Sequence, residues 1–251
     1  MKVVTWNVNG IRAREGQVSE LLAREAPDLV CLQEIKAPSG KVPTSLRELE
    51  GYESCWHGET AYSGVALLVR RGSSPAAPVF VHPAFDFENR AVSAQMGPVT
   101  VVSLYVPNGG KDFDAKLRFL EALDAWAAAE AAAGRRILLC GDLNVTRSDQ
   151  DVHQKERRPS AIGQRDDERT LLARLLGRGL VDVGRALDPA NPALFTWWPP
   201  WRGLRQKNVG WRIDYVVASD GLASGATRCA VLAEYGTSDH APVVAEFGGW
   251  S

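Results

Sequence analysis

The segment 137–144 constrains this chain most, because it joins a buried strand to two polar side chains. Four apolar residues are followed by a glycine, which lets the backbone turn, and then by Asp142 and Asn144. Side chains alternate along an extended chain, so Asp142 and Asn144 are expected to point the same way. Polar groups at the end of a buried strand lie at the rim of a sheet, where ligands bind. Taken alone, however, Gly-Asp after a strand is more typical of a turn.

The same pattern recurs along the chain, and the recurrence favours one shared polar site over a set of separate turns. Strand-like runs adjoin polar residues at five further places: Asn7 and Asn9 after 3–6, Glu34 after 29–33, Tyr105 and Asn108 after 99–104, Asp214 within 213–217, and Asp239 with His240 before 241–244. Asp, Glu, Asn and His gathered in this way indicate a ligand site. The pattern alone does not name a reaction.

Composition places the chain among ordinary globular proteins, with 45% hydrophobic and 24% charged residues. Its 251 residues are enough for one large domain or two small ones. No Pro-rich or Gly/Ser-rich linker divides it, so a single domain over 1–251 is expected. No apolar run approaches the ~18 residues of a membrane span, and the N-terminus enters a strand at once. We therefore expect no membrane association and no signal peptide.

Charge and cysteine content narrow the partners and the compartment. The formal net charge is −1, so a nucleic-acid partner needs a local basic patch. Basic residues cluster at 155–158, at 202–207 and at Arg12 with Arg14, although most such clusters are simply solvated faces. The four cysteines lie far apart without a C-x-x-C pair, which fits a reducing cytoplasm.

Helices and strands alternate throughout the chain. Helices are predicted at 16–25, at 114–133 with a stop at Gly134, and at 167–176, where acidic residues begin the first turn. Short strands are predicted at 2–6, 29–33, 64–70, 91–95, 99–106, 137–141, 213–218 and 242–247. This order predicts an α/β or α+β fold in which two layers of sheet are covered by helices.

Seven segments together resemble exonuclease III and the related apurinic/apyrimidinic endonucleases of the endonuclease/exonuclease/phosphatase superfamily. They are WNVNGIRA at 6–13, LQEIK at 32–36, YSGVAL at 62–67, YVPNG at 105–109, GDLNV at 141–145, KNVGWRIDY at 207–215 and TSDH at 237–240. They come in the family's order and cover nearly the whole chain. The fold that the resemblance implies is a four-layer α/β sandwich, two mixed sheets packed face to face between helices, with the site at one edge of both sheets.

The chemistry of phosphodiester hydrolysis agrees with these residues. The reaction needs a positioned water, charge neutralisation on the phosphate and help for the leaving oxygen. Glu34 is a hard oxygen ligand suited to Mg²⁺, with Mn²⁺ as a substitute, and the metal would stabilise the leaving alkoxide. Without the other motifs, Glu34 would be read as a solvated loop acid.

The resemblance implies roles for the other polar residues of the site. Asp142 orients and helps to deprotonate the attacking water, and Asn144 helps to place that water or the phosphate. Asn7 bonds to this cluster or to the water shell of the metal, and Asp142 and Asn144 belong to the same metal environment. The remaining expectations are that His240 contacts the phosphate with Asp214 as its partner, that Asp239 either binds metal or holds the cluster, and that Tyr105 and Asn108 contact the phosphate. The alternative for His240 is a satisfied structural histidine.

The aromatic segment 195–201 is expected to determine the substrate. By the family's pattern, Trp197, Trp211 and Ile213 line an apolar pocket that accepts a flipped, baseless sugar and excludes a normal nucleotide. The alternative is that these tryptophans belong to the core, as Trp198 is expected to. Trp201 stands where the family places a residue that wedges into the duplex, and a tryptophan there departs from the expected pattern. Backbone contacts to DNA are expected from Arg12, Lys36, Tyr62, Lys111 and Arg205.

A few residues fall outside these motifs. His57, His82 and His153 match no catalytic motif and are expected to be surface or structural residues. Asp149 and Asp151 form either a second acidic site or, more commonly for such a pair, a loop cap. The segment after Asn144 is compact and no N-terminal extension is present, which is a further departure from the family's pattern.

The sequence thus predicts a Mg²⁺-dependent DNA repair nuclease. It would act on double-stranded DNA, cut on the 5′ side of abasic sites, leave a 3′-hydroxyl, trim blocked 3′ ends and run as a 3′→5′ exonuclease. We expect a cytoplasmic monomer. A phosphatase or lipid phosphodiesterase of the superfamily is an alternative, against which 207–215 and the tryptophan pocket argue. A nucleic-acid-binding regulator would lack metal or water-positioning residues, and these are present.

Overall fold

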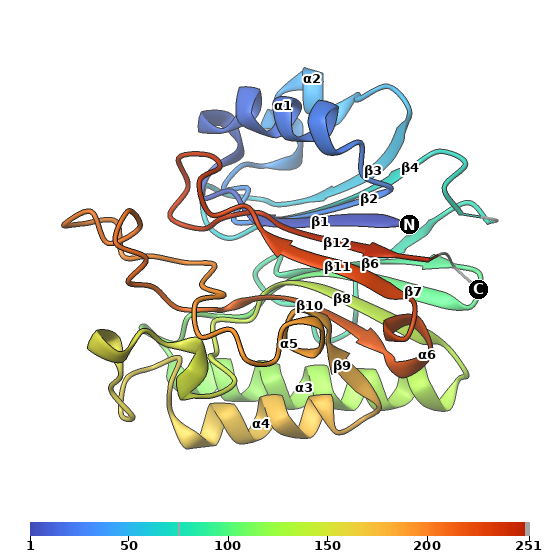
Figure 1. The fold of residues 1–251 in the computed structure, drawn as a ribbon. Coiled ribbons are helices and arrows are strands. Elements are labelled where there is room, and N and C mark those ends of the chain that lie inside the picture. The colour runs from blue at the N-terminus through green and yellow to red at the C-terminus, as the bar shows by residue number, and fades with distance from the viewer. Residues whose placement is uncertain (75, 249–251) are drawn as a thin grey trace.

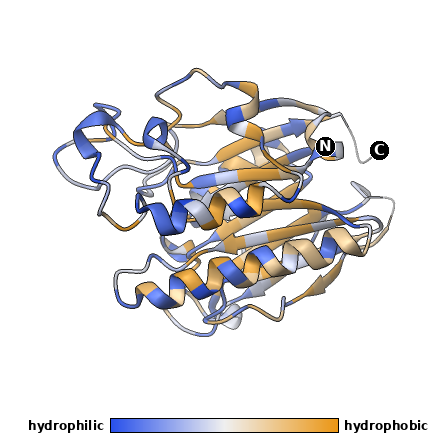
Figure 2. Cartoon of the chain, turned by 90° about the horizontal axis from the view of Figure 1, so that it is seen from below, coloured by the Kyte–Doolittle hydropathy of each residue, from blue (hydrophilic) through white to orange (hydrophobic). Residues whose placement is uncertain are grey.

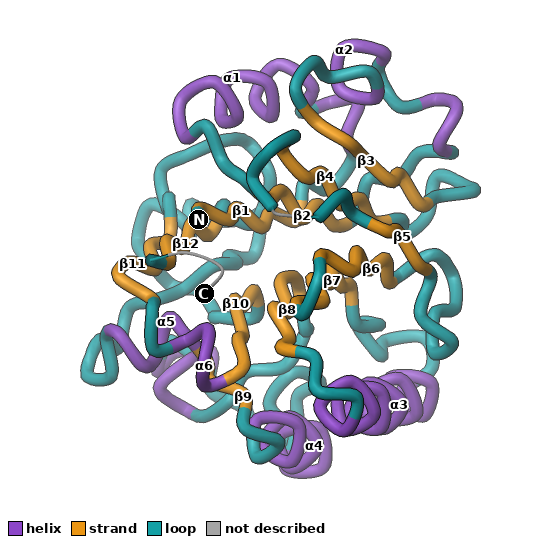
Figure 3. Tube along the Cα trace, turned by 90° about the vertical axis from the view of Figure 1, so that its right-hand side faces the viewer, coloured by secondary structure: helices purple, strands orange, loops and turns teal. Residues whose placement is uncertain are grey.

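Two six-stranded sheets pack face to face, with helices on both outer faces (Figures 1 and 3). The computed structural model describes residues 1–74 and 76–248. The first sheet has the order β11-β12-β1-β2-β4-β3, and the second has the order β5-β6-β7-β8-β10-β9. This arrangement confirms the predicted four-layer sandwich of two mixed sheets between helices. That residues 1–251 form one domain stays a prediction.

The elements have the following bounds. The first sheet contains β1 (Lys2–Asn7), β2 (Leu29–Gln33), β3 (Tyr52–His57), β4 (Val65–Arg70), β11 (Ala226–Val231) and β12 (Val243–Phe247). The second contains β5 (Val79–Val81), β6 (Ala91–Met96), β7 (Val99–Tyr105), β8 (Arg136–Asp142), β9 (Leu180–Asp182) and β10 (Asp214–Ser219). The α-helices are α1 (Glu15–Glu25), α2 (Thr44–Arg47), α3 (Phe113–Ala132), α4 (Asp166–Leu176), α5 (Val183–Leu187) and α6 (Asp220–Ala223). Short 3₁₀ helices lie at Ile11–Ala13, Ser39–Lys41, Asp149–Asp151 and Gln154–Glu156.

Alternation along the strands builds three stacked apolar layers. In β1, Val3 packs between the two sheets, whereas Val4 packs on the outer side against α1 and α2. In β8, Leu138 faces the inter-sheet core and Leu139 faces α3 and α4. Both faces of each central strand are therefore buried, which explains why these strands read as nearly continuous apolar runs. In Figure 2 the strands are mostly apolar, while hydrophilic residues recur along the long helices that cover them.

The predicted elements are confirmed, and every missed strand lies at a sheet edge. The three predicted helices correspond to α1, α3 and α4 within one residue at each end. The eight predicted strands are the central strands of the two sheets. The four missed strands, β3, β5, β9 and β11, are the two outermost strands of each sheet. Three of them, β3, β5 and β11, are largely only half-buried or exposed, so they lack the strong apolar pattern of the centre.

Gly141 corrects one local expectation. It was expected to let the backbone turn before Asp142, but it lies inside β8, which continues to Asp142. Its φ is 152°, and a Cβ there would come within 1.9 Å of the carbonyl oxygen of Leu104 on β7. The glycine is therefore required by the close approach of the neighbouring strand. No helix among the described residues is long and apolar enough to cross a membrane.

Candidate active site

Six polar side chains meet on the side of the sandwich where the ends of the central strands lie, and the strand directions bring them there. β1 runs parallel to β2, and β7 runs parallel to β8, so these four strands end at the same edge. β12 is antiparallel to β1, and β10 is antiparallel to β8, so both begin at that edge. The residues brought together are Asn7, Glu34, Tyr105, Asp142, Asp214 and His240. Three come from each sheet, so the site exists only when the two sheets are packed.

Asn7 joins the two sheets at the centre of this edge. Its Nδ2 donates to Glu34 Oε1 and to Asp142 Oδ2, at 2.9 Å in each case. Its backbone carbonyl accepts from Ser238 Oγ at 2.8 Å, which ties in the segment that carries His240. The Asn7 side chain is fully buried. Its amide therefore sets the separation of the two carboxylates.

Asp142 and Asn144 contact each other, as their spacing suggested. The backbone amide of Asn144 donates to Asp142 Oδ1 at 2.9 Å, and its Nδ2 lies 3.3 Å from Asp142 Oδ2. Asn144 has a φ of 51°, in the left-handed region that asparagine tolerates better than most residues. Asn108 Nδ2 donates to Asn144 Oδ1 at 3.3 Å, and buried Lys116 Nζ donates to the Asn144 carbonyl at 2.7 Å. Asn144 is thus oriented from several sides.

His240 is held by Asp214 and faces Asp142. Its Nδ1 lies 2.9 Å from Asp214 Oδ2, and its Nε2 lies 3.9 Å from Asp142 Oδ2. Asp214 is itself positioned by its backbone amide, which donates to Thr196 Oγ1 at 3.0 Å. With Nδ1 engaged, Nε2 is the ring nitrogen directed at the site.

Charge and burial raise the pKa values of Asp142 and His240 and lower that of Glu34. Burial, together with the charge of Asp214, raises the pKa of the Asp142 carboxyl to about 7, although His240 opposes the shift. Burial alone would lower the pKa of His240, but Asp214 and Asp142 raise it to about 10. Burial likewise opposes ionisation of Glu34, but hydrogen bonds from Asn7 and Lys36 outweigh it and lower its pKa. The geometry therefore favours a cationic His240 beside a carboxylate that titrates near neutral pH.

The donor set fits a divalent cation. Ligand atoms of Glu34, Asp142 and His240 all lie within 4.8 Å of one another, and the two carboxylates supply the ligands, because a protonated His240 has no lone pair for a metal. Lys36 Nζ contacts Glu34 Oε2 at 2.6 Å, so this carboxylate already attracts a positive charge. Carboxylate and amide oxygens at a partly open site are the ligands that Mg²⁺ and Mn²⁺ prefer. Glu34 has a φ of 50°, and such strain in a glutamate is characteristic of functional sites.

Asp239 lies beside this group but is engaged elsewhere. Its Oδ1 accepts from Asn9 Nδ2 at 2.8 Å, and its Oδ2 accepts from Trp197 Nε1 at 3.0 Å. It does not belong to the group of ligand atoms formed by Glu34, Asp142 and His240 among the described residues. Of the two roles expected for Asp239, the geometry favours holding the cluster together.

The tryptophan segment lies against His240. The backbone of Trp197 forms isolated β-bridges with Trp211 and with His240. The Trp197 and Trp211 rings are 5.5 Å apart in an edge-on arrangement, and both are only half-buried. Ile213 is buried beside them, and Trp198 belongs to the core, as expected. Trp201 stands apart with 58% of its surface exposed.

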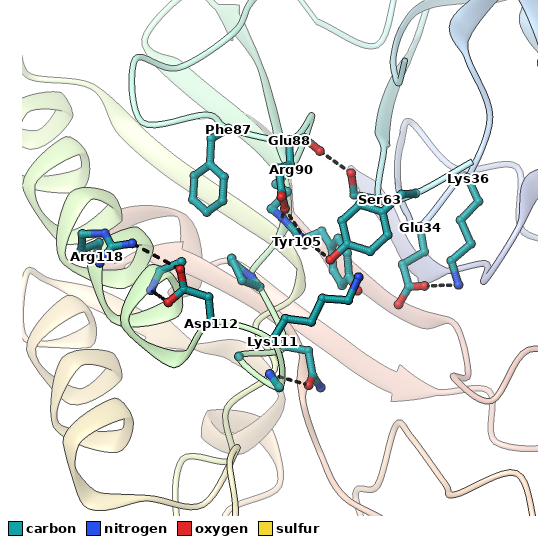
Figure 4. A pocket seen from close by; sticks show the side chains of 16 residues that line it. Glu34, Lys36, Ser63, Phe87, Glu88, Arg90, Tyr105, Lys111, Asp112 and Arg118 are labelled. Atoms are coloured by element: carbon teal, nitrogen blue, oxygen red, sulfur yellow. Dashed lines mark hydrogen bonds and ion pairs between the residues drawn. The ribbon is translucent and has the colours of Figure 1, made fainter. Parts of the chain in front are cut away.

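A cavity of about 660 Å³ opens beside Glu34 (Figure 4). Its lining includes Lys36, Tyr62, Tyr105, Asn108 and Lys111, all of which the sequence assigned to phosphate or backbone contacts. The ammonium group of Lys111 lies 5.0 Å from the centre of the Tyr62 ring. Burial raises the pKa of Tyr105, and the charges of Glu34 and Asp142 add to this, so its hydroxyl stays neutral.

Two of the expected DNA contacts lie outside this cavity. Arg12 is exposed in the 3₁₀ helix after β1. Arg205 is different, because its Nε, Nη1 and Nη2 donate to the carbonyl oxygens of Ala233, Ser238 and Tyr235. These bonds indicate that Arg205 positions the segment before His240, and they leave few donors for a phosphate.

Sequence reasoning missed two buried cations at the site. Arg90 Nη2 donates to the Tyr62 hydroxyl at 3.1 Å, and its guanidinium lies 4.7 Å from the centre of the Tyr105 ring. Lys116 is fully buried in α3, where it pairs with Glu168 and supports Asn144. A lysine on the apolar face of an expected helix was the only available signal for Lys116. For Arg90 the sequence offered only the neighbouring acid Glu88, with which it pairs, and its contacts with Tyr62 and Tyr105 come from distant segments.

Comparison with known proteins agrees with this geometry. The model of the endonuclease/exonuclease/phosphatase family matches residues 4–240. An exodeoxyribonuclease of Bacillus subtilis (strain 168) is 32% identical over 250 residues, which cover 97% of this chain and 98% of that protein. A variant of the 3′ phosphatase NExo from Neisseria, solved with a product DNA hairpin, matches with a TM-score of 0.89 at 33% identity over 98% of this chain and 99% of its own. An AP endonuclease from Archaeoglobus fulgidus matches with a TM-score of 0.88 at 28% identity, covering 99% of both chains.

The chain therefore belongs to the endonuclease/exonuclease/phosphatase family. Within that family it is a hydrolase of the exodeoxyribonuclease III and AP endonuclease type, which confirms the resemblance carried by the seven motifs.

Proposed function

We propose that this protein is a Mg²⁺-dependent DNA repair nuclease that acts on double-stranded DNA. It hydrolyses the phosphodiester on the 5′ side of an abasic site, leaves a 3′-hydroxyl, and removes blocking groups and nucleotides from 3′ ends. The observation that carries the proposal is the convergence of Glu34, Asp142 and His240 within 4.8 Å, next to a half-buried tryptophan pair. The chemistry and the substrate preference would then share one edge of the sandwich.

Asp142 acts as the general base on the attacking water. A carboxylate with a pKa of about 7 is matched to proton transfer at neutral pH, whereas an ordinary aspartate is too weak a base. Asn7 and Asn144 each donate to Asp142, and these bonds hold its lone pairs in one orientation. The water attacks phosphorus as its proton passes to Asp142, and the bond to the 3′ oxygen breaks.

His240 and Tyr105 stabilise the charge that develops on the phosphate. His240, with a pKa of about 10, is protonated at neutral pH and directs Nε2–H toward the site. The neutral Tyr105 hydroxyl is a second donor from the opposite sheet. Preorganised donors of this kind are each worth ~10²–10³ in turnover in comparable sites.

Glu34 would hold the divalent cation, and Asn7, whose Nδ2 donates to Glu34 and Asp142, would orient these two carboxylates beside it. When bound, the cation supplies charge neutralisation at the phosphate and stabilises the leaving alkoxide. Glu34→Gln should keep the fold and lose most activity, with partial rescue by raised Mg²⁺ or Mn²⁺. Undiminished turnover of the wild type in excess chelator would disprove the metal requirement.

The tryptophan pair would select a baseless sugar. Trp197 and Trp211 stand edge-on beside His240, where they would admit a deoxyribose without a base and exclude a nucleotide that carries one. Trp201 is exposed and free to stack on the duplex, and such stacking is worth ~1–3 kcal/mol. Trp201→Ala should therefore weaken DNA binding by roughly one to two powers of ten.

The decisive experiment compares three duplexes in the presence of Mg²⁺: one with an abasic site, one intact and blunt, and one with a 3′-phosphate. Wild type should prefer the abasic site or the blocked end, and Trp211→Ala should lower the ratio of abasic-site cleavage to normal-duplex cleavage. Trp198→Phe, a change in the core, serves as the control. An unchanged ratio in Trp211→Ala would show that the tryptophan pair does not determine substrate choice.

We also propose that the protein is a monomer, which light scattering would check, and that it is located in the cytoplasm.

A further inference from the structure

A second cluster of side chains that could bind a metal lies outside the candidate active site, next to the outermost strands β3 and β5 of the two sheets. His57 ends β3, which is the edge strand of the first sheet. His82 directly follows β5, which is the edge strand of the second sheet, and Asp86 lies in the loop that leads to β6. Ligand atoms of these three residues all lie within 4.8 Å of one another.

Alternation along β3 explains why His57 reaches the other sheet. Trp56 packs on the outer side, in the layer with α1 and α2. Cys55 packs against the core between the sheets, and His57 is on the same face of the strand as Cys55. At the end of the strand this face meets the loop of the second sheet, and His57 Nε2 lies 2.6 Å from Asp86 Oδ2.

The other two members are held in place for ligation. Asp86 Oδ1 accepts the backbone amides of Arg90 and Ala91, at 2.7 and 2.8 Å, so Oδ2 is the oxygen left facing the imidazoles. The His57 and His82 rings have their centres 3.9 Å apart and are tilted by 43°. His82 is exposed, which gives an ion access to the cluster. Among the described residues no Lys or Arg forms an ion pair with Asp86, whose side-chain neighbour is His57.

We propose that His57, His82 and Asp86 form a transition-metal site of the Zn²⁺ class, distinct from the magnesium site at Glu34. Two imidazoles and one carboxylate are a donor set that favours Zn²⁺ and its neighbours over Mg²⁺, and three protein ligands leave a position for water. The ion would replace the short contact between His57 and Asp86 with two bonds of about 2.0–2.2 Å.

Such an ion would clamp the open edges of the two sheets together. The loop that carries Asp86 continues into Phe87, Glu88 and Arg90, which line the cavity beside Glu34 (Figure 4). The clamp would therefore also fix one wall of the substrate cavity. This role is structural, and no chemical step of phosphodiester hydrolysis depends on it.

The test is Co²⁺ titration of the full protein in saturating Mg²⁺, followed by visible absorption, because nitrogen-ligated Co²⁺ gives bands that a carboxylate-bound Mg²⁺ site does not. Wild type should bind one Co²⁺ with such bands, and zinc should displace it and raise the melting temperature. His82→Gln should weaken binding by about ten-fold or more and remove the Zn²⁺-induced rise in melting temperature. His153→Gln, which changes a histidine outside the cluster, should behave as wild type.

Two further variants keep the outcome decisive. Glu34→Gln should retain the Co²⁺ bands, which separates this site from the catalytic metal. Asp86→Asn should weaken Co²⁺ binding as His82→Gln does. Wild type without nitrogen-type bands, or His82→Gln with the same Co²⁺ affinity and Zn²⁺ response as wild type, would overturn the proposal. Loss of the bands in Glu34→Gln alone would assign the ion to the catalytic site and equally overturn it.

Discussion

The protein has two buried clusters of charged side chains, and the balance between carboxylates and cations is opposite in the two. At the catalytic edge, four carboxylates, Glu34, Asp142, Asp214 and Asp239, face two cationic side chains, Lys36 and His240. The two other buried cations nearby, Arg90 and Lys116, are paired with Glu88 and Glu168. In the second cluster, two carboxylates, Asp151 and Asp182, face three guanidinium groups, those of Arg147, Arg185 and Arg212. The first cluster has more carboxylates than cations, and the second has more cations than carboxylates.

The proton affinities follow this difference. Burial raises the pKa of Asp142 to about 7, and the negative charge of Asp214 adds to this shift. Burial would also raise the pKa of Asp151, but Arg212 and Arg185 outweigh it and hold that pKa below the ordinary value. A cluster with an excess of carboxylates attracts a divalent cation. A cluster whose carboxylates are paired with guanidinium groups instead stabilises the fold. The pair Asp149 and Asp151, for which a second acidic site or a loop cap was expected, therefore belongs in part to a structural ion-pair network.

The largest expected effect comes from breaking the catalytic cluster. Asp142→Asn and His240→Ala should each lower kcat by ~10²–10⁴ while DNA binding is nearly preserved. The reason is that Asp142 acts on the attacking water and His240 on the reacting phosphate. Single-turnover rates with binding measured in parallel are the check. A loss that appears only in affinity would contradict the assigned roles.

Breaking the compensated cluster should instead destabilise the fold. The Arg212 side chain is only 4% exposed, and Arg212→Ala leaves two buried carboxylates without their main partner. The free energy of unfolding should fall by about 3–5 kcal/mol in denaturant titrations. Arg147→Ala is the matched control, because its side chain is 45% exposed and its pair is worth about 0–1 kcal/mol. Equal losses in both variants would contradict the comparison.

The dependence of activity on pH tests the electrostatics of the catalytic cluster. Asp142 must be ionised and His240 protonated, so kcat/KM should rise as pH passes about 7 and fall as it passes about 10. Asp214 raises both of these pKa values, so Asp214→Asn should move both limbs to lower pH. A bound cation favours the ionised carboxylate, and the acid limb should therefore also move down as Mg²⁺ is raised. Limbs that stay in place in Asp214→Asn would be inconsistent with this account.

The smallest expected effect concerns the exposed cations at the cavity. Lys111 is exposed at the cavity rim, and Lys111→Ala should reduce the slope of log affinity against log salt by about one. Arg71 is a suitable control because it follows β4, whose end lies at the opposite edge of the sheet. Arg71→Ala should leave the slope unchanged. A salt-insensitive wild type would favour a small phosphate ester over DNA.

The sequence by itself determined the central part of the fold and the membership of the site. Strands buried on both faces have a strong apolar pattern, and short polar motifs at their ends mark the shared edge. The edge strands escaped detection, because β3, β5 and β11 are half-exposed and β9 has only three residues. His57 and His82, expected to be surface or structural residues, lie on or next to two of these strands, so their proximity was not foreseeable.

Only the tertiary structure decided how the charges are compensated. Asp142 and Asp151 are both buried acids nine positions apart in the chain, and the sequence does not show which cations each of them meets. Their partners come from β1, from α5 and from the segments before β10 and β12, so the difference arises when the two sheets pack. The apolar pattern along the chain shows which residues are buried and to which side of a strand they point, because both follow from local periodicity. Electrostatic environment depends on groups distant in sequence, and it is therefore decided by packing.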